Sequence, residues 1–454
     1  MSGCQWKVGE VAMFLQNQTC LKDLPVPTLM LRMAPPVMIS LLAQSIYNVV
    51  DSYFVTQYSS AALTALAIIY PVQLLMMAIA TGTGVGINIL LARLDGGEKF
   101  DTPANVAKSG LFLGGANYVG FGVLGLLFVK SYYELSTNNQ LVQRMGVNYA
   151  MIIFLFAFSL FIEANLTKML QAKGRMIGPM VAQIVGNLLN IILNPLLIFG
   201  GWGIPRLGIR GSALATIIGQ FVALVIVAFQ VRKWQSFAGR VQFKTCVAIY
   251  RQGSASILLQ SLYTVYIVGL NLILKRFGST AINVLGIYYR LQAFFFIPLE
   301  GLQQVILPIV SYNFGAKQLR RIKEVVRLAL LVAGLVTIFG AVIFIGLPRN
   351  LLMIYSNQPS LLRIGIEAFR VIGSSFIPAG VSMMLVVYFQ ATNQLAKSIW
   401  VSLTRELFLL VPLAWVFQFF GLRYFWYTFP VTEVVTTLLA IGLYYQRNRR
   451  LYLL

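Results

Sequence analysis

The sequence predicts an all-α polytopic membrane protein, with twelve transmembrane helices in two pseudo-symmetric six-helix bundles. Its composition is the first reason: 58% of the 454 residues are hydrophobic and only 11% are charged, against roughly 25% charged residues in soluble domains. The second is a succession of apolar runs, each long enough for a helix of about 20 residues to cross a bilayer. The third is an internal repeat with a single register. Together these observations exclude an ordinary soluble enzyme.

Twelve apolar runs separated by polar loops are candidate spans. In the first half they are predicted at 34–55, 62–91, 105–129, 146–170, 178–199 and 209–231. In the second half they are predicted at 250–274, 281–311, 325–346, 362–391, 398–420 and 424–446. Residues 1–33 have no sustained apolar run before Leu29, so they are interpreted as a cytoplasmic N-terminal segment and not as a signal peptide.

A constant offset of 219 residues relates the two halves without a gap. The matched residues are Arg32 and Arg251, Tyr47 and Tyr266, Tyr70 and Tyr289, Gln73 and Gln292, Gly82 and Gly301, Gly96 and Gly315, Gln171 and Gln390. The repeat divides the chain into an N-lobe (34–231), a basic cytoplasmic linker (232–249), a C-lobe (250–446) and a cytoplasmic tail (447–454). Six spans return a half to its starting side, so the repeat is parallel, which suits alternating access between two lobes.

Lysine and arginine are distributed unevenly between the two sides of the predicted membrane domain. Of 35 such residues, 24 fall on the side of both termini and 10 on the other, with Arg290 inside a span. The positive-inside rule therefore places both termini in the cytoplasm. This bias also explains most of the net charge of +22 without nucleic acid. The basic cluster at 320–327 is the best candidate for contact with anionic lipid headgroups.

Several kinds of chemistry are excluded or disfavoured by the residues themselves. The chain has no histidine, so no catalytic triad that needs histidine can form. Its three cysteines share no zinc-binding spacing. Gly82, Gly84 and Gly86 lie in an apolar run without a following P-loop lysine, which indicates close helix packing and not phosphate binding. We expect neither an enzyme nor a cofactor.

Acidic and amide side chains inside the predicted spans are the candidate functional residues. Asp51 follows Tyr47 on one face of the first span, where a carboxylate could exchange a proton or bind Na⁺; an interfacial aspartate capped by hydroxyls is the alternative. The fifth span carries an amide stripe at spacings of four, three and four, followed by Pro195. The stripe consists of Gln183, Asn187, Asn190 and Asn194. Its amide oxygens suit an alkali cation, and hydrogen bonding between helices is the alternative.

Other polar residues are assigned to the substrate or to structure. Glu300 in the eighth span is predicted to line a cavity between the lobes, together with Gln183, Asn187 and Tyr149. Arg290 lies ten residues before Glu300, or about 15 Å along a helix, so the two are not direct partners. A second polar group is expected to form structural pairs. It comprises Arg405 and Glu406 in the eleventh span and Glu433 in the twelfth.

Several segments resemble the multidrug and toxic compound extrusion (MATE) transporters of the MOP flippase superfamily. Pro35–Pro36 through Tyr47–Val55 resembles their first helix, and Asn190–Gly200 and Gly211–Thr216 resemble their fifth and sixth helices. Other segments with the same order and spacing are Gly82–Gly86, Leu170–Gly174 and Leu307–Lys317. The resemblance extends over nearly the whole chain and is strongest to the prokaryotic branch of DNA-damage-inducible and MepA-like exporters.

The resemblance implies a two-lobe exporter that exchanges H⁺ or Na⁺ for organic cations or other amphipathic compounds. It assigns the cation site to Asp51, with Tyr47, Asn190 and Thr216 at matching positions. Asn194 departs from the pattern, because many relatives carry Asp there; one carboxylate then remains to hold a proton or a Na⁺ ion. The candidate Na⁺ ligands are Asp51, Asn190, Asn194 and Thr216.

The sequence therefore predicts a secondary active antiporter for multidrug efflux, monomeric, in the inner membrane of a prokaryote. Its partners are a small cationic or amphipathic substrate and membrane lipids. The main alternative is a lipid-linked saccharide flippase of the same superfamily, for which Arg290 would provide positive charge. An integral membrane enzyme and a passive channel are further alternatives.

Overall fold

The computed structural model describes residues 21–22, 24–201, 203 and 205–451, which form helices and no β-strand. The first half contains α2 (Val26–Tyr58), α3 (Ser60–Asp95), α4 (Pro103–Ser136), α5 (Gln140–Leu155), α6 (Phe158–Ala172), α7 (Ile177–Phe199) and α8 (Ile209–Arg232). The second half begins with α9 (Phe243–Leu274), η1 (Lys275–Phe277), α10 (Ser279–Gly315), α11 (Leu319–Gly346) and α12 (Pro348–Met353). It continues with α13 (Pro359–Gly373), α14 (Phe376–Ala391), α15 (Leu395–Leu403), η2 (Thr404–Leu410), α16 (Val411–Phe417), η3 (Gln418–Phe420), α17 (Leu422–Trp426) and α18 (Thr428–Leu451).

Ten helices of the described chain are long and apolar enough to cross a membrane, and two bent pairs raise the number to twelve. The pairs are α5 with α6, bent by 46°, and α13 with α14, bent by 47°. The bends occupy equivalent places in the two halves. The prediction of an all-α protein with twelve spans is therefore confirmed.

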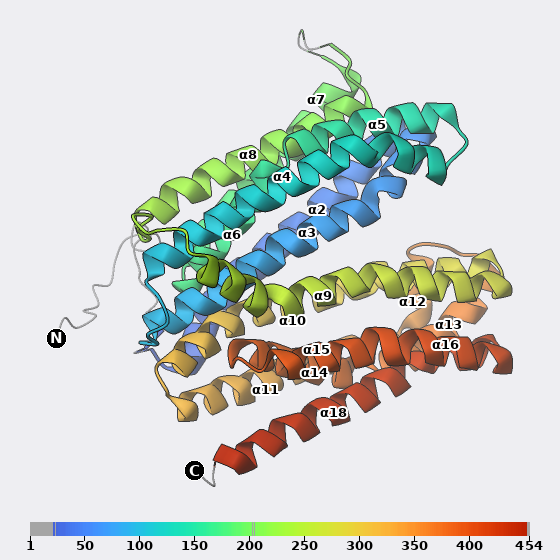
Figure 1. Cartoon of the computed structure of the whole chain (residues 1–454). Helices are drawn as coiled ribbons and strands as arrows, with labels where there is room; N and C mark the ends of the chain where they lie inside the picture. The colour runs from blue at the N-terminus through green and yellow to red at the C-terminus, as the bar shows by residue number, and fades with distance from the viewer. Residues whose placement is uncertain (1–20, 23, 202, 204, 452–454) are drawn as a thin grey trace, which may run out of the picture.

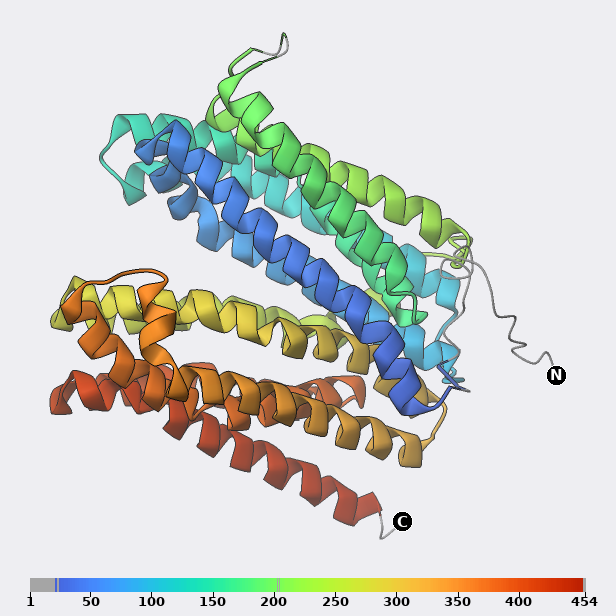
Figure 2. The same cartoon turned by 180° about the vertical axis from the view of Figure 1, so that it is seen from behind.

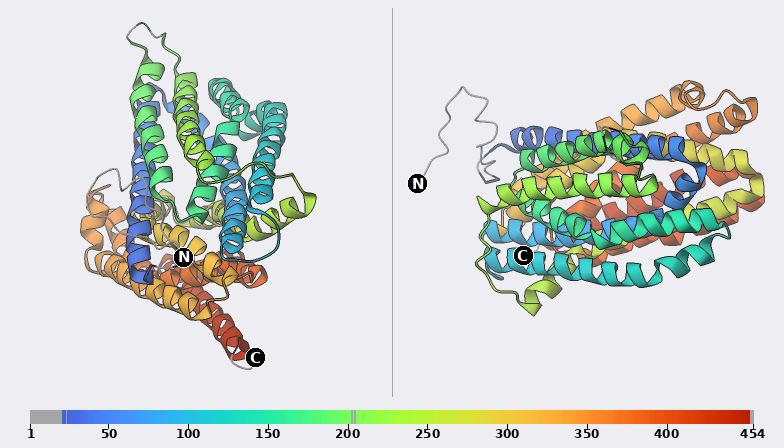
Figure 3. Two further views of the ribbon diagram at one scale, coloured as in Figure 1. Left: turned by 90° about the vertical axis from the view of Figure 1, so that its left-hand side faces the viewer. Right: turned by 90° about the horizontal axis from the view of Figure 1, so that it is seen from above.

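The helices form two groups that meet at one end and diverge toward the other (Figure 1). Helices α2–α8 make the first group, and α9–α18 make the second. The start of α2 and the end of α18 lie on the side where the groups converge, as the reverse view also shows (Figure 2). A view turned by 90° about the vertical axis shows the same two bundles (Figure 3, left).

The repeat is visible in the helix boundaries. Ser60 and Ser279 begin α3 and α10, and Ile209 and Thr428 begin α8 and α18. Each pair is separated by the predicted offset of 219 residues. The other equivalent helices start within three residues of this offset, so each helix of one lobe has a counterpart in the other.

Helices α2 and α9 begin furthest ahead of the starts that the hydropathy pattern predicts. Helix α2 begins at Val26 instead of residue 34, and α9 begins at Phe243, inside the stretch predicted as the linker. The first turns of α2 bury Val26, Leu29 and Met33 against protein. Because protein and not lipid covers these turns, they need no continuous apolar run, so a spanning pattern does not detect them.

The first helix of each lobe starts against the opposite lobe. The beginning of α2 belongs to the same hydrophobic cluster as α10, and the beginning of α9 packs on α3. At the second crossing a Cβ on Gly86 would collide with the backbone of Ile249, and one on Gly253 would collide with the carbonyl of Gly82. Only glycine permits so close an approach of two backbones, which confirms the packing role predicted for the glycines of α3.

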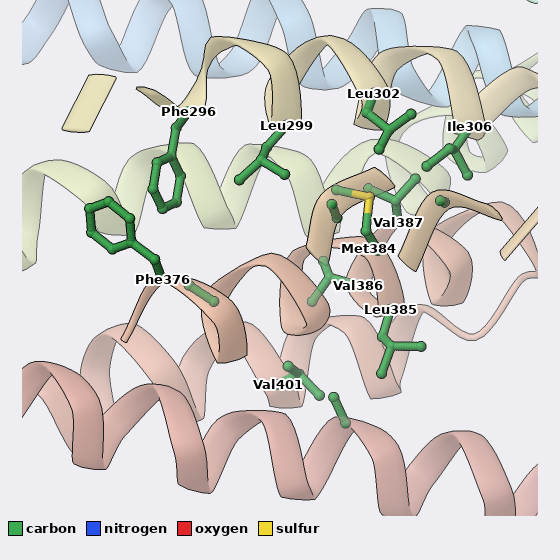
Figure 4. Packing of buried hydrophobic residues seen from close by; sticks show 14 of the residues in the cluster. Phe296, Leu299, Leu302, Ile306, Phe376, Met384, Leu385, Val386, Val387 and Val401 are labelled. Carbon is green, nitrogen blue, oxygen red and sulfur yellow. The ribbon is translucent and has the colours of Figure 1, made fainter. Parts of the chain in front are cut away.

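The largest core fills the C-lobe. Phe296, Leu299, Leu302 and Ile306 of α10 face the buried residues of α14 (Figure 4). Phe296 meets Phe376 edge-on, with ring centroids 5.2 Å apart. This apolar packing makes α10 and α14 a rigid part of the lobe.

A group of hydrogen bonds, called here the Asp101 clasp, holds the segment that connects the lobes against α4 and the residues just before it. Asp101 accepts hydrogen bonds from the Thr245 hydroxyl of α9 and from the Asn105 amide, the latter at 2.7 Å. The backbone N–H of Arg240 donates to Asn105 Oδ1 at 2.7 Å. Tyr250 donates to Asn117 Oδ1 at 2.5 Å. The first half of α9 is therefore bound to the N-lobe although the rest of the helix belongs to the C-lobe.

The charge of Asp101 is stabilised by this clasp. Partial burial acts to raise the pKa of Asp101. Hydrogen bonds from Thr245, Asn105 and Thr102 lower it, and the nearby charge of Lys244 adds to this effect, so the pKa lies below its ordinary value. A carboxyl with a lowered folded-state pKa stabilises the fold above its unfolded-state pKa, and this stability is lost as the pH falls through the folded-state value.

We predict that Asp101→Asn lowers the stability of the protein at neutral pH by about 1–2 kcal/mol, because hydrogen bonds to a charged acceptor are lost. The measurement is thermal unfolding in detergent across a pH series. The deficit should shrink as the pH falls below the ordinary range of an aspartate. A deficit that is the same at every pH would show that the charge of Asp101 contributes nothing.

Candidate cation-coupling site

Asp51 is held by side chains from two other helices of the N-lobe. It lies near the C-terminal end of α2 and is partly buried. Asn194 Nδ2, on α7, donates to Asp51 Oδ1 at 2.5 Å. The Ser212 hydroxyl, on α8, donates to the same oxygen at 3.2 Å. The carboxylate therefore joins α2, α7 and α8.

A second set of hydrogen bonds surrounds this carboxylate. Asn190 Nδ2 donates to Thr216 Oγ1 at 3.2 Å. This bond links α7 and α8 one helical turn away from Asn194 and Ser212. The Thr216 side chain also interacts with the Tyr47 phenol, which lies close to Asp51. Tyr149 of α5 is near both Tyr47 and Asp51. The carboxylate therefore lies within an extended polar group in an apolar lobe.

The site has unused oxygen atoms and no cationic partner. None of the ion pairs found among the described residues includes Asp51. The amide oxygens of Asn190 and Asn194 are buried and have no hydrogen-bond partner. Buried polar atoms without partners indicate a bound water or ion. One carboxylate with amide and hydroxyl oxygens fits either a proton on Asp51 or a Na⁺ ion.

The structure brings together all five residues predicted for the cation site. They are Tyr47, Asp51, Asn190, Asn194 and Thr216. Ser212 belongs to the same group but sequence reasoning missed it. The signal was available, because Ser212 lies four residues before Thr216 and so occupies the same helix face.

The residues predicted for the substrate do not form one group. Asn187 is buried on α7 and Gln183 is half-buried, both on the side of Asn190 away from Asp51. Tyr149 is buried in the N-lobe and accepts a hydrogen bond from Gln73 at 3.4 Å. Glu300 lies on α10 of the other lobe, where its side chain is exposed.

Lys168 makes a contact between the lobes that sequence reasoning missed. It lies on α6, is only 8% exposed, and donates to Gln171 Oε1 at 2.8 Å and to Gln304 Oε1 at 3.1 Å. Gln304 belongs to α10, so the bond to Gln304 crosses between the lobes. From the sequence, Lys168 was counted only among the basic residues that determine the orientation in the membrane. Its position inside the predicted fourth span (146–170) was the signal for a buried role.

Comparison with known proteins gives matches over almost the whole chain. The MatE family model matches residues 36–196 and 255–416. The FAD transporter of Shewanella oneidensis is 25% identical over 448 residues, covering 96% of this chain and 97% of the relative. The multidrug export protein MepA of Staphylococcus saprophyticus is 24% identical, covering 93% of this chain and 94% of the relative.

Solved structures share the fold. A multidrug resistance MATE family transporter of the MOP superfamily, described in its outward-facing conformation, has a TM-score of 0.86 at 21% identity and covers 95% of this chain and 98% of its own. A MOP superfamily transporter from Pyrococcus furiosus has a TM-score of 0.84 at 20% identity, covering 97% and 98%. The two-bundle architecture is thus that of a known class of transporter.

We predict that Asn194→Ala destabilises the protein by about 1.5–3 kcal/mol, the usual range for a hydrogen bond to a charged group. Asn187→Ala is the matched control, since Asn187 is also buried on α7 but its amide nitrogen has no partner. Thermal unfolding of both variants should be repeated with Asp51→Asn in the background. If the two variants differ as much in that background as in the wild type, the Asn194–Asp51 bond is not the cause.

Proposed function

Because this chain belongs to the MatE family of membrane transporters, we propose that it is a secondary active antiporter that exports organic cations or other amphipathic compounds. The inward-moving ion is H⁺ or Na⁺, bound at Asp51. The family is one of transporters and not of enzymes. Relatives named as multidrug export proteins support this class of cargo.

The observation that carries the proposal is the Asp51 carboxylate without a cationic partner. It has two hydrogen-bond donors, Asn194 and Ser212, and buried amide oxygens nearby. Binding a cation there neutralises the only charge of the group. The hydrogen bonds joining α2, α7 and α8 then change their donors and acceptors, which alters the packing of these helices.

Alternating access requires the contacts at the converging end to break. Those contacts are the Lys168–Gln304 bond, the glycine crossing of α3 with α9 and the Asp101 clasp. A cation shifts this equilibrium only if Asp51 binds it more tightly in one state than in the other. With both termini in the cytoplasm of a prokaryote, the described state is closed toward the cytoplasm. The protein would act as a monomer in the inner membrane.

We predict that Asp51→Asn abolishes coupled transport in reconstituted vesicles, because the site loses its only negative charge. The measurement is efflux of cationic dyes under separately imposed pH and Na⁺ gradients, together with dye-dependent ion movement. Whichever gradient drives the wild type identifies the ion.

The matched control for this experiment is Glu134→Gln, which removes an exposed carboxylate of the same lobe. It should transport like the wild type. Dye-dependent H⁺ or Na⁺ movement at the wild-type level in Asp51→Asn would exclude Asp51 as the coupling residue.

A second class of cargo, an anionic flavin nucleotide, is favoured by Lys168. This buried cation lies between the lobes, where a cargo passing through must approach it. A relative named as an FAD transporter has its similarity spread over 96% of this chain. Phosphate groups are recognised by buried basic side chains with amide donors beside them, and Gln171 and Gln304 are such neighbours.

We predict that, if the cargo is a flavin nucleotide, Lys168→Met reduces FAD flux at least tenfold, whereas Lys168→Arg retains most of it because the charge is kept. Uptake of FAD and of a cationic dye into inverted vesicles should be compared for both variants. FAD flux that is absent in the wild type, or equal in Lys168→Met, would leave only the cationic cargo.

A further inference from the structure

The repeat relates the helices of the Asp51 site to three elements of the C-lobe. At the offset of 219 residues, α2, α7 and α8 correspond to α9, to the segment α15–η2–α16, and to α18. Tyr266 then occupies the position of Tyr47, but Leu270 and Leu413 occupy those of Asp51 and Asn194. The C-lobe has a different carboxylate on the equivalent helix, because Glu406 stands at the position of Asn187.

The helix that carries Glu406 differs in geometry from α7 of the N-lobe. Residues Thr404–Leu410 form a π-helical segment, a rare conformation that is frequent at functional sites. In the N-lobe, α7 passes α8 closely, since a Cβ on Gly186 would press on the carbonyl of Gly219. The residue of η2 at the position of Gly186 is Arg405, whose side chain is too large for such an approach. Charged side chains lie between η2 and α18 instead, where Arg405 pairs with Glu433.

The charges at this place do not balance. Arg405 binds Glu433 of α18, with Nε 2.8 Å and the NH2 nitrogen 2.7 Å from Oε1. Glu406 is 6% exposed and its Oε2 has no hydrogen-bond partner; Oε2 of Glu433 has none either. One guanidinium therefore faces two carboxylates, which leaves a net charge of −1. A buried uncompensated charge is strongly unfavourable, so the site should take up a cation.

The elements that pack most closely against η2 are α9, α15, α16 and α18. Helix α9 brings Tyr263 and Tyr266 close to Glu406, and α18 brings Glu433. Helix α16 has no titratable residue. Lys397 lies two turns away on α15 and donates to the carbonyl of Leu443. Thus no second cationic side chain of the described chain neutralises Glu406.

Hydroxyl groups extend from the carboxylate along both helices. Ser402 and Ser398 precede Glu406 by four and eight residues, and α18 carries Thr428, Thr432 and Thr436 at the same spacing. All five are buried, and none of their hydroxyl oxygens has a partner. Polar atoms in this state indicate ordered water, which is the usual carrier of protons through a buried region.

We propose that Glu406 is a proton-binding site of the C-lobe, separate from the Asp51 site, with the Arg405–Glu433 pair as its fixed neighbour. The carboxylate takes one proton from water and becomes a neutral acid, which brings the net charge of the group from −1 to zero. Na⁺ is disfavoured because Arg405 lies at the site.

Infrared difference spectroscopy of the purified protein in lipid tests this directly, because a protonated carboxyl has its own C=O stretching band. Spectra between alkaline and mildly acid pH should contain a band that disappears in Glu406→Gln and shifts in Glu406→Asp. Glu324→Gln is the matched control, since Glu324 is an exposed carboxylate on α11 of the same lobe, and it should keep the band. Thermal unfolding verifies that each variant is folded.

Identical difference spectra for the wild type and Glu406→Gln would overturn the proposal. So would loss of the band on adding Na⁺ at constant pH, which would show a sodium site instead. This measurement needs no transport, so it gives a result even if the proposed antiport fails. This last readout rests on the proposed function: where the ion moved at Asp51 is H⁺, Glu406→Gln in vesicles should lower the number of protons moved per substrate about twofold, because Asp51 alone then carries protons.

Discussion

The structure depends on keeping the Asp51 carboxylate inside an apolar helix bundle. A charge at membrane depth is costly unless fixed donors replace the water it has lost. Here the donors are Asn194 and Ser212, which come from two different helices. The same hydrogen bonds that make the charge tolerable also join α2, α7 and α8. We therefore expect a change in the charge of Asp51 to alter the packing of these three helices.

The two lobes are joined by backbone contacts that allow few intermediate arrangements. Glycines of α3 and α9 approach so closely that small displacements would produce collisions or lose the contact. Helices α2 and α9 strengthen this connection, because each belongs to one lobe and its first turns pack against the other lobe. Such tightly packed interfaces tend to have two discrete states, which is what alternating access between lobes requires.

Much of the site could be predicted because polar residues are conspicuous in apolar helices. Asp51 and the amides of α7 are visible at helical spacing, and the structure places Asn190 and Asn194 beside Asp51 and Thr216. Ser212 and Lys168 were missed for different reasons. A serine is common in membrane helices and is distinguished only by its partner. A lysine near a helix end is assigned to the surface unless a second lobe is known to cover it.

The sequence by itself determined the class of protein, the twelve spans, the repeat and most of the polar residues at membrane depth. These follow from hydropathy, charge and spacing, which are properties of single segments. Only the tertiary structure decided which of those residues meet, that α2 begins at Val26, and that Glu406 lacks the partner that Glu433 has in Arg405. Whether two polar side chains form a hydrogen bond or an ion pair depends on the distance between their helices. That distance is set by how closely glycines, leucines and charged residues let the helices approach.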